Sequence, residues 1–174
     1  MEQTKQPPKI NFAHFLGKFP EVELPVTLGE ESHHAFSQEN EPMPPMMIEQ
    51  FILPVEQAPA DDYTEFVPCM KVPKTGDFHA IIYWRAGLLN YQYTLATFTN
   101  KGEWIDKRVI AGTFSDGETL TTSVATIDED WMIYIVSGNA GGNGTAYDAS
   151  SSTAYKLELL PDGKIANTLT MEGS

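Results

Sequence analysis

The prolines of this chain are confined almost entirely to its first part. Eleven of the twelve lie before residue 75, and the other is Pro161. Proline has no backbone N–H donor and is poorly tolerated in helix interiors and in central strands. The first part should therefore contain only short, irregular elements. We expect a single domain, 1–174, in which an acidic, proline-rich N-terminal part (1–64) wraps a regular body (65–174).

From Glu65 onward, apolar and polar side chains alternate with a period of two, in segments rich in Tyr, Trp, Ile, Val and Thr. Such segments favour β-strands, and the short glycine-containing turns between them favour antiparallel hairpins. The expected strands are 65–72, 78–85, 91–99, 103–111, 119–127, 131–137, 153–160 and 164–171. The sequence thus predicts a mainly β fold, an antiparallel meander of about eight strands that forms a sandwich or a partly closed barrel.

The N-terminal part is expected to add two short helices. The first has apolar side chains at the spacing of one helix face, with Asn11 as its cap and Pro20 at its end: Phe12, Phe15, Leu16 and Phe19. The second should run from about Pro45 to Leu53. Residues 22–28 alternate like a short edge strand that Pro25 interrupts, and the polar residues 30–44 should form an exposed loop.

Two parts of the β-body resemble each other. Asp77-Phe78 and the apolar residues that follow it match Asp130-Trp131 and the residues after that pair. A Gly/Ser-rich stretch, 138–152, accounts for the extra length of the second part. The pattern indicates two related hairpin units, and chance similarity between hairpins is the alternative explanation.

The charge of the chain is strongly negative and unevenly distributed. The formal net charge is −13, and residues 1–66 carry 12 acidic and 3 basic side chains. Nucleic-acid binding requires a surplus of Lys and Arg, so this charge argues against it. The charge favours solubility or a basic protein partner, which would meet the N-terminal third.

The sequence contains no recognisable catalytic, metal-binding or cofactor-binding motif. A single cysteine, Cys69, excludes an intramolecular disulfide and a cysteine-rich zinc site, and its apolar surroundings suggest a buried thiol. The four histidines lack metal-ligand spacing, although His79 shares a strand face with Ile81 and Tyr83 and could line a pocket. We therefore predict no cofactor, no metal site and no enzymatic activity.

Candidate contact residues come from the aromatic strands and the glycine-rich stretch. Trp and Arg are favoured at interface anchors, and loops that hold many glycines often contact ligands or partners. The candidate interaction surface consists of Trp84, Arg85, Gly141, Asn143 and Tyr147.

One long stretch carries a resemblance. The segment DFHAIIYWRAGLLNYQYTLATFTNKGEWIDKRVIAGT at 77–113, together with SVATIDEDWMIYIV at 123–136, resembles uncharacterised bacterial proteins of the Bacteroidetes. The resemblance implies a bacterial source and assigns no activity, cofactor or functional residue.

Three functional hypotheses remain open. The first is a non-enzymatic protein-binding module, such as an inhibitor or immunity protein against a basic partner. The second is an envelope-associated carrier of small molecules, and the third is a hydrolase with an unrecognised site. The polar start of the chain lacks a signal-peptide h-region and no segment is long and apolar enough to span a membrane, so we expect a cytoplasmic protein, or a periplasmic or lipid-anchored one if a leader was removed. Its oligomeric state is open.

Overall fold

The fold is dominated by one antiparallel sheet, which confirms the mainly β prediction. The computed structural model describes residues 10–57, 64–88, 90–115, 117–140 and 153–168. Within these ranges the strands are β1 (Val26–Leu28), β2 (Glu65–Lys71), β3 (Phe78–Ala86), β4 (Asn90–Thr99), β5 (Trp104–Ser115), β6 (Leu120–Ile127), β7 (Met132–Ala140), β8 (Thr153–Leu159) and β9 (Ile165–Asn167). Strands β2 to β9 are the eight expected from the period-two pattern, each within a few residues of its predicted position.

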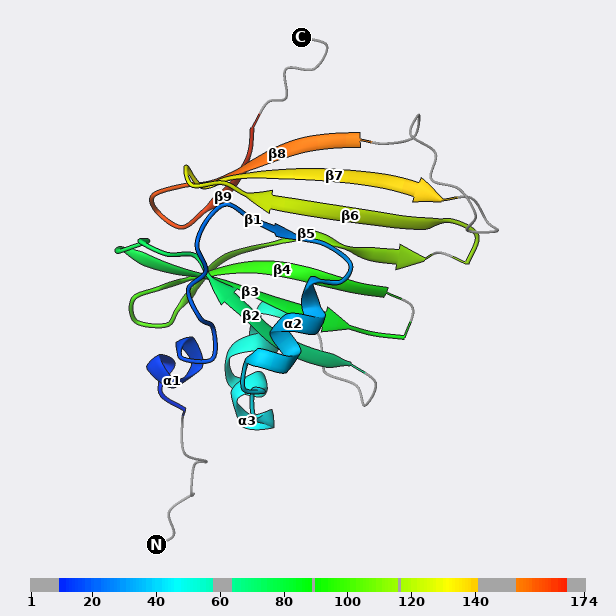
Figure 1. Ribbon diagram of the computed structural model, residues 1–174. Helices are drawn as coiled ribbons and strands as arrows, with labels where there is room; N and C mark the ends of the chain where they lie inside the picture. Colours follow the sequence, from blue (N-terminus) through cyan, green and yellow to red (C-terminus); the bar gives the residue numbers. More distant parts are fainter. Residues whose placement is uncertain (1–9, 58–63, 89, 116, 141–152, 169–174) are drawn as a thin grey trace, which may run out of the picture.

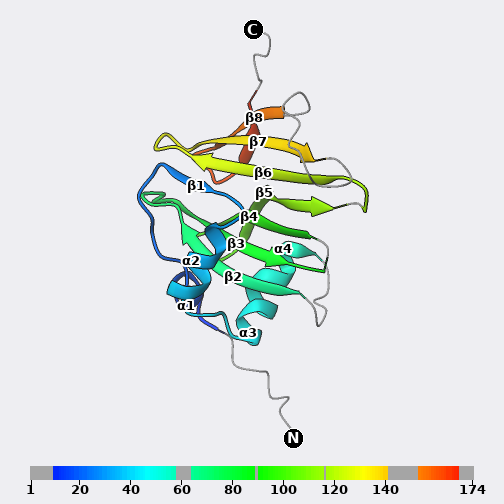
Figure 2. The same ribbon diagram turned by 45° about the vertical axis from the view of Figure 1, so that its right-hand side comes forward.

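The strands from β2 to β9 pair in chain order, so the sheet is a meander. It is continuous and is not closed into a barrel. In Figures 1 and 2, β2–β4 and β6–β8 lie in two layers, and β5 connects them. The predicted antiparallel meander is thus confirmed, and its single sheet coils without closing into a barrel.

The change of direction takes place in β5. Its residues 104–114 pair with β4, whereas only 112–115 pair with β6. Gly112 lies at this point with φ +153°, next to a β-bulge between β4 and β5. Where β5 leaves β6, β1 takes its place and pairs with 125–127 of β6. Bulges and glycines are the usual means by which a strand passes from one layer to the next.

Side chains also connect β9, at one end of the sheet, to β5 in its middle. The Asp106 carboxylate in β5 accepts a hydrogen bond from the Ile165 backbone N–H in β9, at 2.9 Å. Arg108 in β5 donates to the Asn167 side chain at 2.8 Å. These contacts hold β9 beside β5 without backbone pairing between the two strands.

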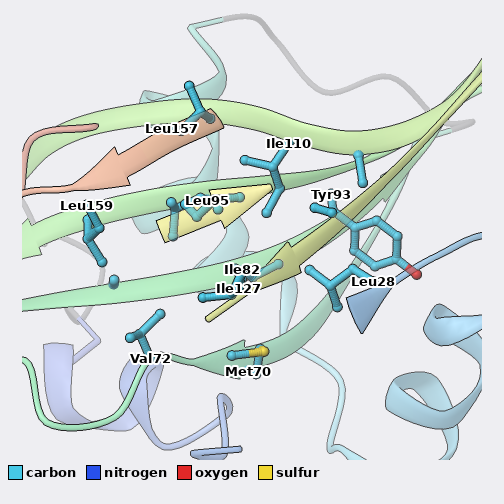
Figure 3. Packing of buried hydrophobic residues seen from close by; sticks show 14 of the residues in the cluster. Leu28, Met70, Val72, Ile82, Tyr93, Leu95, Ile110, Ile127, Leu157 and Leu159 are labelled. Carbon is cyan, nitrogen blue, oxygen red and sulfur yellow. The ribbon is translucent and has the colours of Figure 1, made fainter. Parts of the chain in front are cut away.

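The core has two parts. The first cluster lies inside the coil and gathers side chains from β1 to β9, among them Ile82, Leu95, Ile127 and Leu157, all 0–1 % exposed (Figure 3). The second lies between the sheet and the helices, where the Phe15 and Phe51 rings stack with centroids 4.5 Å apart. Burial of each such side chain contributes roughly 1.5–3 kcal/mol.

The helices gather against β2–β4 in Figures 1 and 2. They are α1 (Phe12–Leu16), α2 (Ser32–Glu39), and a continuous helical stretch made of α3 (Pro45–Met47), a π-helical segment (Ile48–Ile52) and α4 (Leu53–Glu56). The two expected helices are confirmed. Asn11 caps α1 as predicted, since its side chain accepts a hydrogen bond from the Ala13 N–H at 2.7 Å. Helix α1 ends at Leu16, earlier than Pro20.

The exposed loop predicted for 30–44 is wrong, because α2 lies within it. No residue of α2 is buried, so the sequence lacks the regularly spaced apolar residues that usually indicate a helix. Tertiary contacts hold the helix instead. The His33 ring stacks on Trp84 at 4.2 Å, and the Asn40 side chain after the helix donates to the Pro68 and Cys69 carbonyls at 2.8 and 2.9 Å.

Candidate functional site

One groove in the described part of the chain lies where three separate segments meet, and we call it the acidic groove. Its volume is about 790 Å³. Its lining residues are Glu21, Val22, Glu23, Leu24, Pro73, Lys74, Glu129 and Trp131. They come from the segment before β1, from the turn between β2 and β3, and from the turn between β6 and β7.

The segment before β1 is fixed to the end of β2. The Lys71 N–H donates to the Pro20 carbonyl at 2.9 Å, and Glu21 forms an isolated parallel bridge with Lys71. Residues 21–24 then alternate between exposed carboxylates and half-buried apolar side chains. Val22 and Leu24 pack against the first core cluster, so the two glutamates point outward along the groove.

The turn between β6 and β7 supplies the opposite side. The Trp131 N–H donates to the Asp128 carbonyl at 3.0 Å, and the Asp128 N–H donates to the Met132 carbonyl at 2.8 Å. This closed turn places Trp131 at φ +69°, a left-handed conformation that is uncommon for an aromatic residue. Its ring lies edge-on to Phe78, with centroids 5.6 Å apart. The turn therefore holds the indole firmly while Glu129 stays exposed beside it.

The groove combines an apolar base with a negative rim. Three exposed glutamates face one exposed lysine, Lys74, while Val22, Leu24 and Trp131 are half-buried. Such an arrangement is suited to binding an extended segment that carries both apolar and basic side chains.

The structure separates the residues that the sequence proposed as one contact surface. Trp84 is 8 % exposed, belongs to the first core cluster and is covered by His33. Arg85, the next residue of β3, forms an ion pair with the Glu56 carboxylate at 3.2 Å. Successive strand residues point to opposite faces, so the two side chains do not share a surface. Gly141, Asn143 and Tyr147 lie outside the described residues.

The other candidate side chains, those of Cys69 and His79, pack against neighbouring residues of the fold. Cys69 is fully buried and burial raises the pKa of its thiol far above the usual range, which makes it a poor nucleophile. His79 shares its face with Ile81 and Tyr83, as predicted, and its ring lies 5.7 Å from that of Phe12 beneath the helices. Burial lowers the pKa of His79.

No group of three or more His, Cys, Asp or Glu side chains is arranged to hold a metal ion in the part of the chain that the structure describes. The helices described are also all too short or too polar to cross a lipid bilayer.

Sequence reasoning did not identify the acidic groove. The sequence predicts a short edge strand at 22–28, which includes Val22, Glu23 and Leu24 of the groove but gives no sign of a groove there. The one available signal was the alternation of glutamate with apolar residues in Glu21-Val22-Glu23-Leu24, which gives a short extended segment one charged and one apolar side.

Comparison with known proteins adds no relative: no protein-family model matches the chain, and no curated protein or solved structure is significantly similar to it.

Proposed function

We propose that the protein is a non-enzymatic binding module that recognises a basic protein through the acidic groove. An inhibitor or immunity-type protein that neutralises a basic partner is the specific form of this proposal. The observation that carries it is the placement of Glu21, Glu23 and Glu129 around an apolar base that contains Trp131.

The charge of the whole chain supports the proposal. A net charge of −13 creates a long-range field that speeds the approach of a positively charged partner. Complementary charge at the groove then favours the correct orientation in the encounter. Glu21 and Glu23 belong to the acidic N-terminal third, where the charge distribution leads us to expect a basic partner to bind.

The rigidity of the groove also supports the proposal. Trp131 is held by the β6–β7 turn and by Phe78, and residues 20 and 21 are hydrogen-bonded or bridged to β2. A preformed groove loses little conformational entropy on binding, and aromatic anchors contribute strongly to interfaces.

The test compares two triple variants that remove equal charge. The groove variant is Glu21→Gln, Glu23→Gln and Glu129→Gln. The control variant is Glu39→Gln, Glu49→Gln and Glu103→Gln, three exposed residues that do not line the groove. The dissociation constant of a fluorescent peptide of alternating lysine and leucine is measured for each, together with a peptide in which glutamate replaces lysine.

We expect the groove variant to bind the lysine peptide at least about fivefold more weakly than the wild type, because each exposed ion pair contributes about 0.2–1 kcal/mol. The control variant should stay within about twofold, since none of its three side chains lines the groove and salt weakens more distant charge interactions. Equal losses in both variants would mean that net charge alone attracts the peptide. Equal binding of the two peptides by the wild type would contradict recognition of a basic partner.

The same variants can then be applied to a partner isolated from the native host. A partner whose capture is lost with the groove variant and kept with the control variant would connect the groove to its biological role. A partner captured equally by both variants would bind elsewhere on the protein.

A further inference from the structure

A second groove lies between α1, the helical stretch 45–56 and the turn that joins β4 to β5. Its volume is about 390 Å³. We call it the aromatic groove, and its lining residues are Ile10, Phe12, Gln50, Phe51, Pro54, Val55, Phe98, Lys101, Gly102 and Trp104. Sites for small molecules usually occupy about 300–1,000 Å³ and are lined by apolar side chains with few polar groups.

The apolar wall of this groove is fixed by close packing. The Phe12 ring lies 5.7 Å from Phe51 and 5.6 Å from Phe98, measured between ring centroids. Gly102 adopts φ +92°, and a Cβ atom there would lie 3.0 Å from the Phe12 ring. The turn therefore approaches the ring as closely as a glycine allows. The groove is shaped by the fold and does not depend on a ligand for its walls.

Trp104 completes the wall on the side of the sheet. It is the first residue of β5 and is 39 % exposed. An indole that is partly open to water within an apolar groove offers surface that a bound apolar group would cover.

The polar groups of the groove are few, and most are already engaged. The Gln50 side chain accepts a hydrogen bond from the Ile10 N–H at 2.8 Å and donates to the Ile10 carbonyl at 2.9 Å. Among the described residues that line the groove, Lys101 is the one charged side chain. The Val55 carbonyl accepts a hydrogen bond from the Lys107 ammonium group at 2.7 Å.

This local positive charge contrasts with the net charge of −13 for the chain. An anion would be repelled by most of the molecule, whereas at the groove it would meet the ammonium group of Lys101. The shape selects an apolar body, and Lys101 selects a negatively charged end group.

We propose that the aromatic groove binds a small amphipathic carboxylate, with its apolar chain against Phe12, Phe98 and Trp104 and its carboxylate at Lys101. This site is separate from the acidic groove, shares no lining residue with it, and does not depend on the function proposed there.

The experiment uses decanoate as the probe and isothermal titration calorimetry to measure its dissociation constant. Decyltrimethylammonium carries the same chain with the opposite charge, and butyrate carries the same charge with a short chain. We expect decanoate to bind at least about tenfold more tightly than either, since a correct ligand needs both parts. Equal binding of decanoate and decyltrimethylammonium, or no binding of decanoate, would overturn the proposal.

Two charge-reversal variants test the position of the carboxylate. Lys101→Glu should weaken decanoate binding at least about fivefold, because an attraction is replaced by a repulsion. Lys164→Glu makes the same change in net charge at an exposed residue that does not line this groove, and it should change the affinity by less than about twofold. Equal weakening in both variants would show a general charge effect and would overturn the assignment of Lys101.

Tryptophan fluorescence tests the position of the apolar chain. The wild-type emission should shift to shorter wavelength when decanoate binds, because Trp104 loses contact with water. In Trp104→Phe the calorimetric binding should remain while this shift disappears. A shift that persists in Trp104→Phe would place the ligand near Trp84 or Trp131 and would overturn the proposed site.

Discussion

The hydroxyl group of Tyr83, in the middle of β3, donates a hydrogen bond to the Glu56 carboxylate at the end of α4. The same carboxylate pairs with Arg85, two residues further along β3, at 3.2 Å. Tyr83 is fully buried, and burial together with the nearby Glu56 carboxylate raises the pKa of its hydroxyl group far above the usual value. The phenol therefore stays protonated and remains a donor. This contact fixes the last turn of the helical stretch 45–56 to the sheet.

Replacement of Tyr83 by Phe removes this donor and keeps the ring in the second core cluster. We expect the free energy of unfolding to fall by about 1–2 kcal/mol, since hydrogen bonds to charged groups contribute more than neutral ones. Urea unfolding of Tyr83→Phe, Glu56→Gln and the double variant measures the effect. If the losses in the two single variants simply add, the two side chains are not coupled and the contact does not stabilise the fold.

Gly112 allows β5 to pass from one layer to the other, and we expect it to tolerate no side chain. A Cβ atom at this position would lie 2.4 Å from the Tyr91 carbonyl oxygen and 2.8 Å from the Gln92 Cα atom. These are backbone atoms that cannot move without disturbing the pairing of β4 and β5. Gly112→Ala should therefore cost about 2–4 kcal/mol of stability.

Gly117 provides the matched control for this substitution. It also has a positive φ, +94°, but a Cβ atom there would meet no other atom within 4 Å. Gly117→Ala should therefore lower the free energy of unfolding by about 1 kcal/mol, because only the left-handed backbone conformation is unfavourable for alanine. Thermal or urea unfolding distinguishes the two variants, and equal losses would show that steric contact at Gly112 is unimportant.

Stability should rise with pH through the titration range of histidine. Burial lowers the pKa of His33, with a further contribution from His34, and burial followed by Lys71 lowers the pKa of His79, both from the usual 6.5. Below 6.5 the unfolded chain therefore binds more protons than the folded protein, so acid favours unfolding. The contribution is fully present above that pH and is lost as the pH falls below it.

The double variant His33→Phe and His79→Phe isolates this contribution, because both side chains keep an aromatic ring. Urea unfolding between about pH 5.5 and 7.5 should show a smaller dependence on pH for the variant than for the wild type. If the free energy of unfolding depended on pH equally in the variant and the wild type, the pH dependence would come from the carboxylates instead.

Asp106 holds the β8–β9 hairpin against β5. Its carboxylate accepts hydrogen bonds from the Ile165 N–H at 2.9 Å and from the Lys107 N–H at 2.8 Å. Asp106→Ala leaves the Ile165 N–H without this partner, which should destabilise the hairpin by about 1–3 kcal/mol. Hydrogen exchange at Ile165 should become at least about fivefold faster.

Asp162 in the turn of the same hairpin serves as the control. Its side chain accepts a hydrogen bond from the Lys164 N–H at 3.0 Å, in an exposed position. Asp162→Ala should therefore leave exchange at Ile165 within about twofold of the wild type. Unchanged exchange in Asp106→Ala would mean that β9 is held by its pairing with β8 alone.

Most of the β-body could be predicted because its signals are local. Alternation of side chains and a glycine turn are properties of a few neighbouring residues, and they located the eight strands from β2 to β9. The cap at Asn11 and the prolines near residue 45 likewise marked two helices. Helix α2 gave no such signal, because its contacts are with Trp84 and with the backbone of β2, far away in the sequence.

The sequence by itself determined the mainly β composition, the meander of strands and the acidic character of the N-terminal third. The tertiary structure decided what those features form. It brought the carboxylates of Glu21 and Glu23 beside Glu129, which lies more than 100 residues away. It also covered Trp84 with the His33 ring and paired Arg85 with Glu56. Strand periodicity fixes which side chains share a face, but the coil of the sheet and the helices packed on it fix which face is covered and which segments meet. Grooves form where segments distant in sequence come into contact, so local sequence patterns do not reveal them.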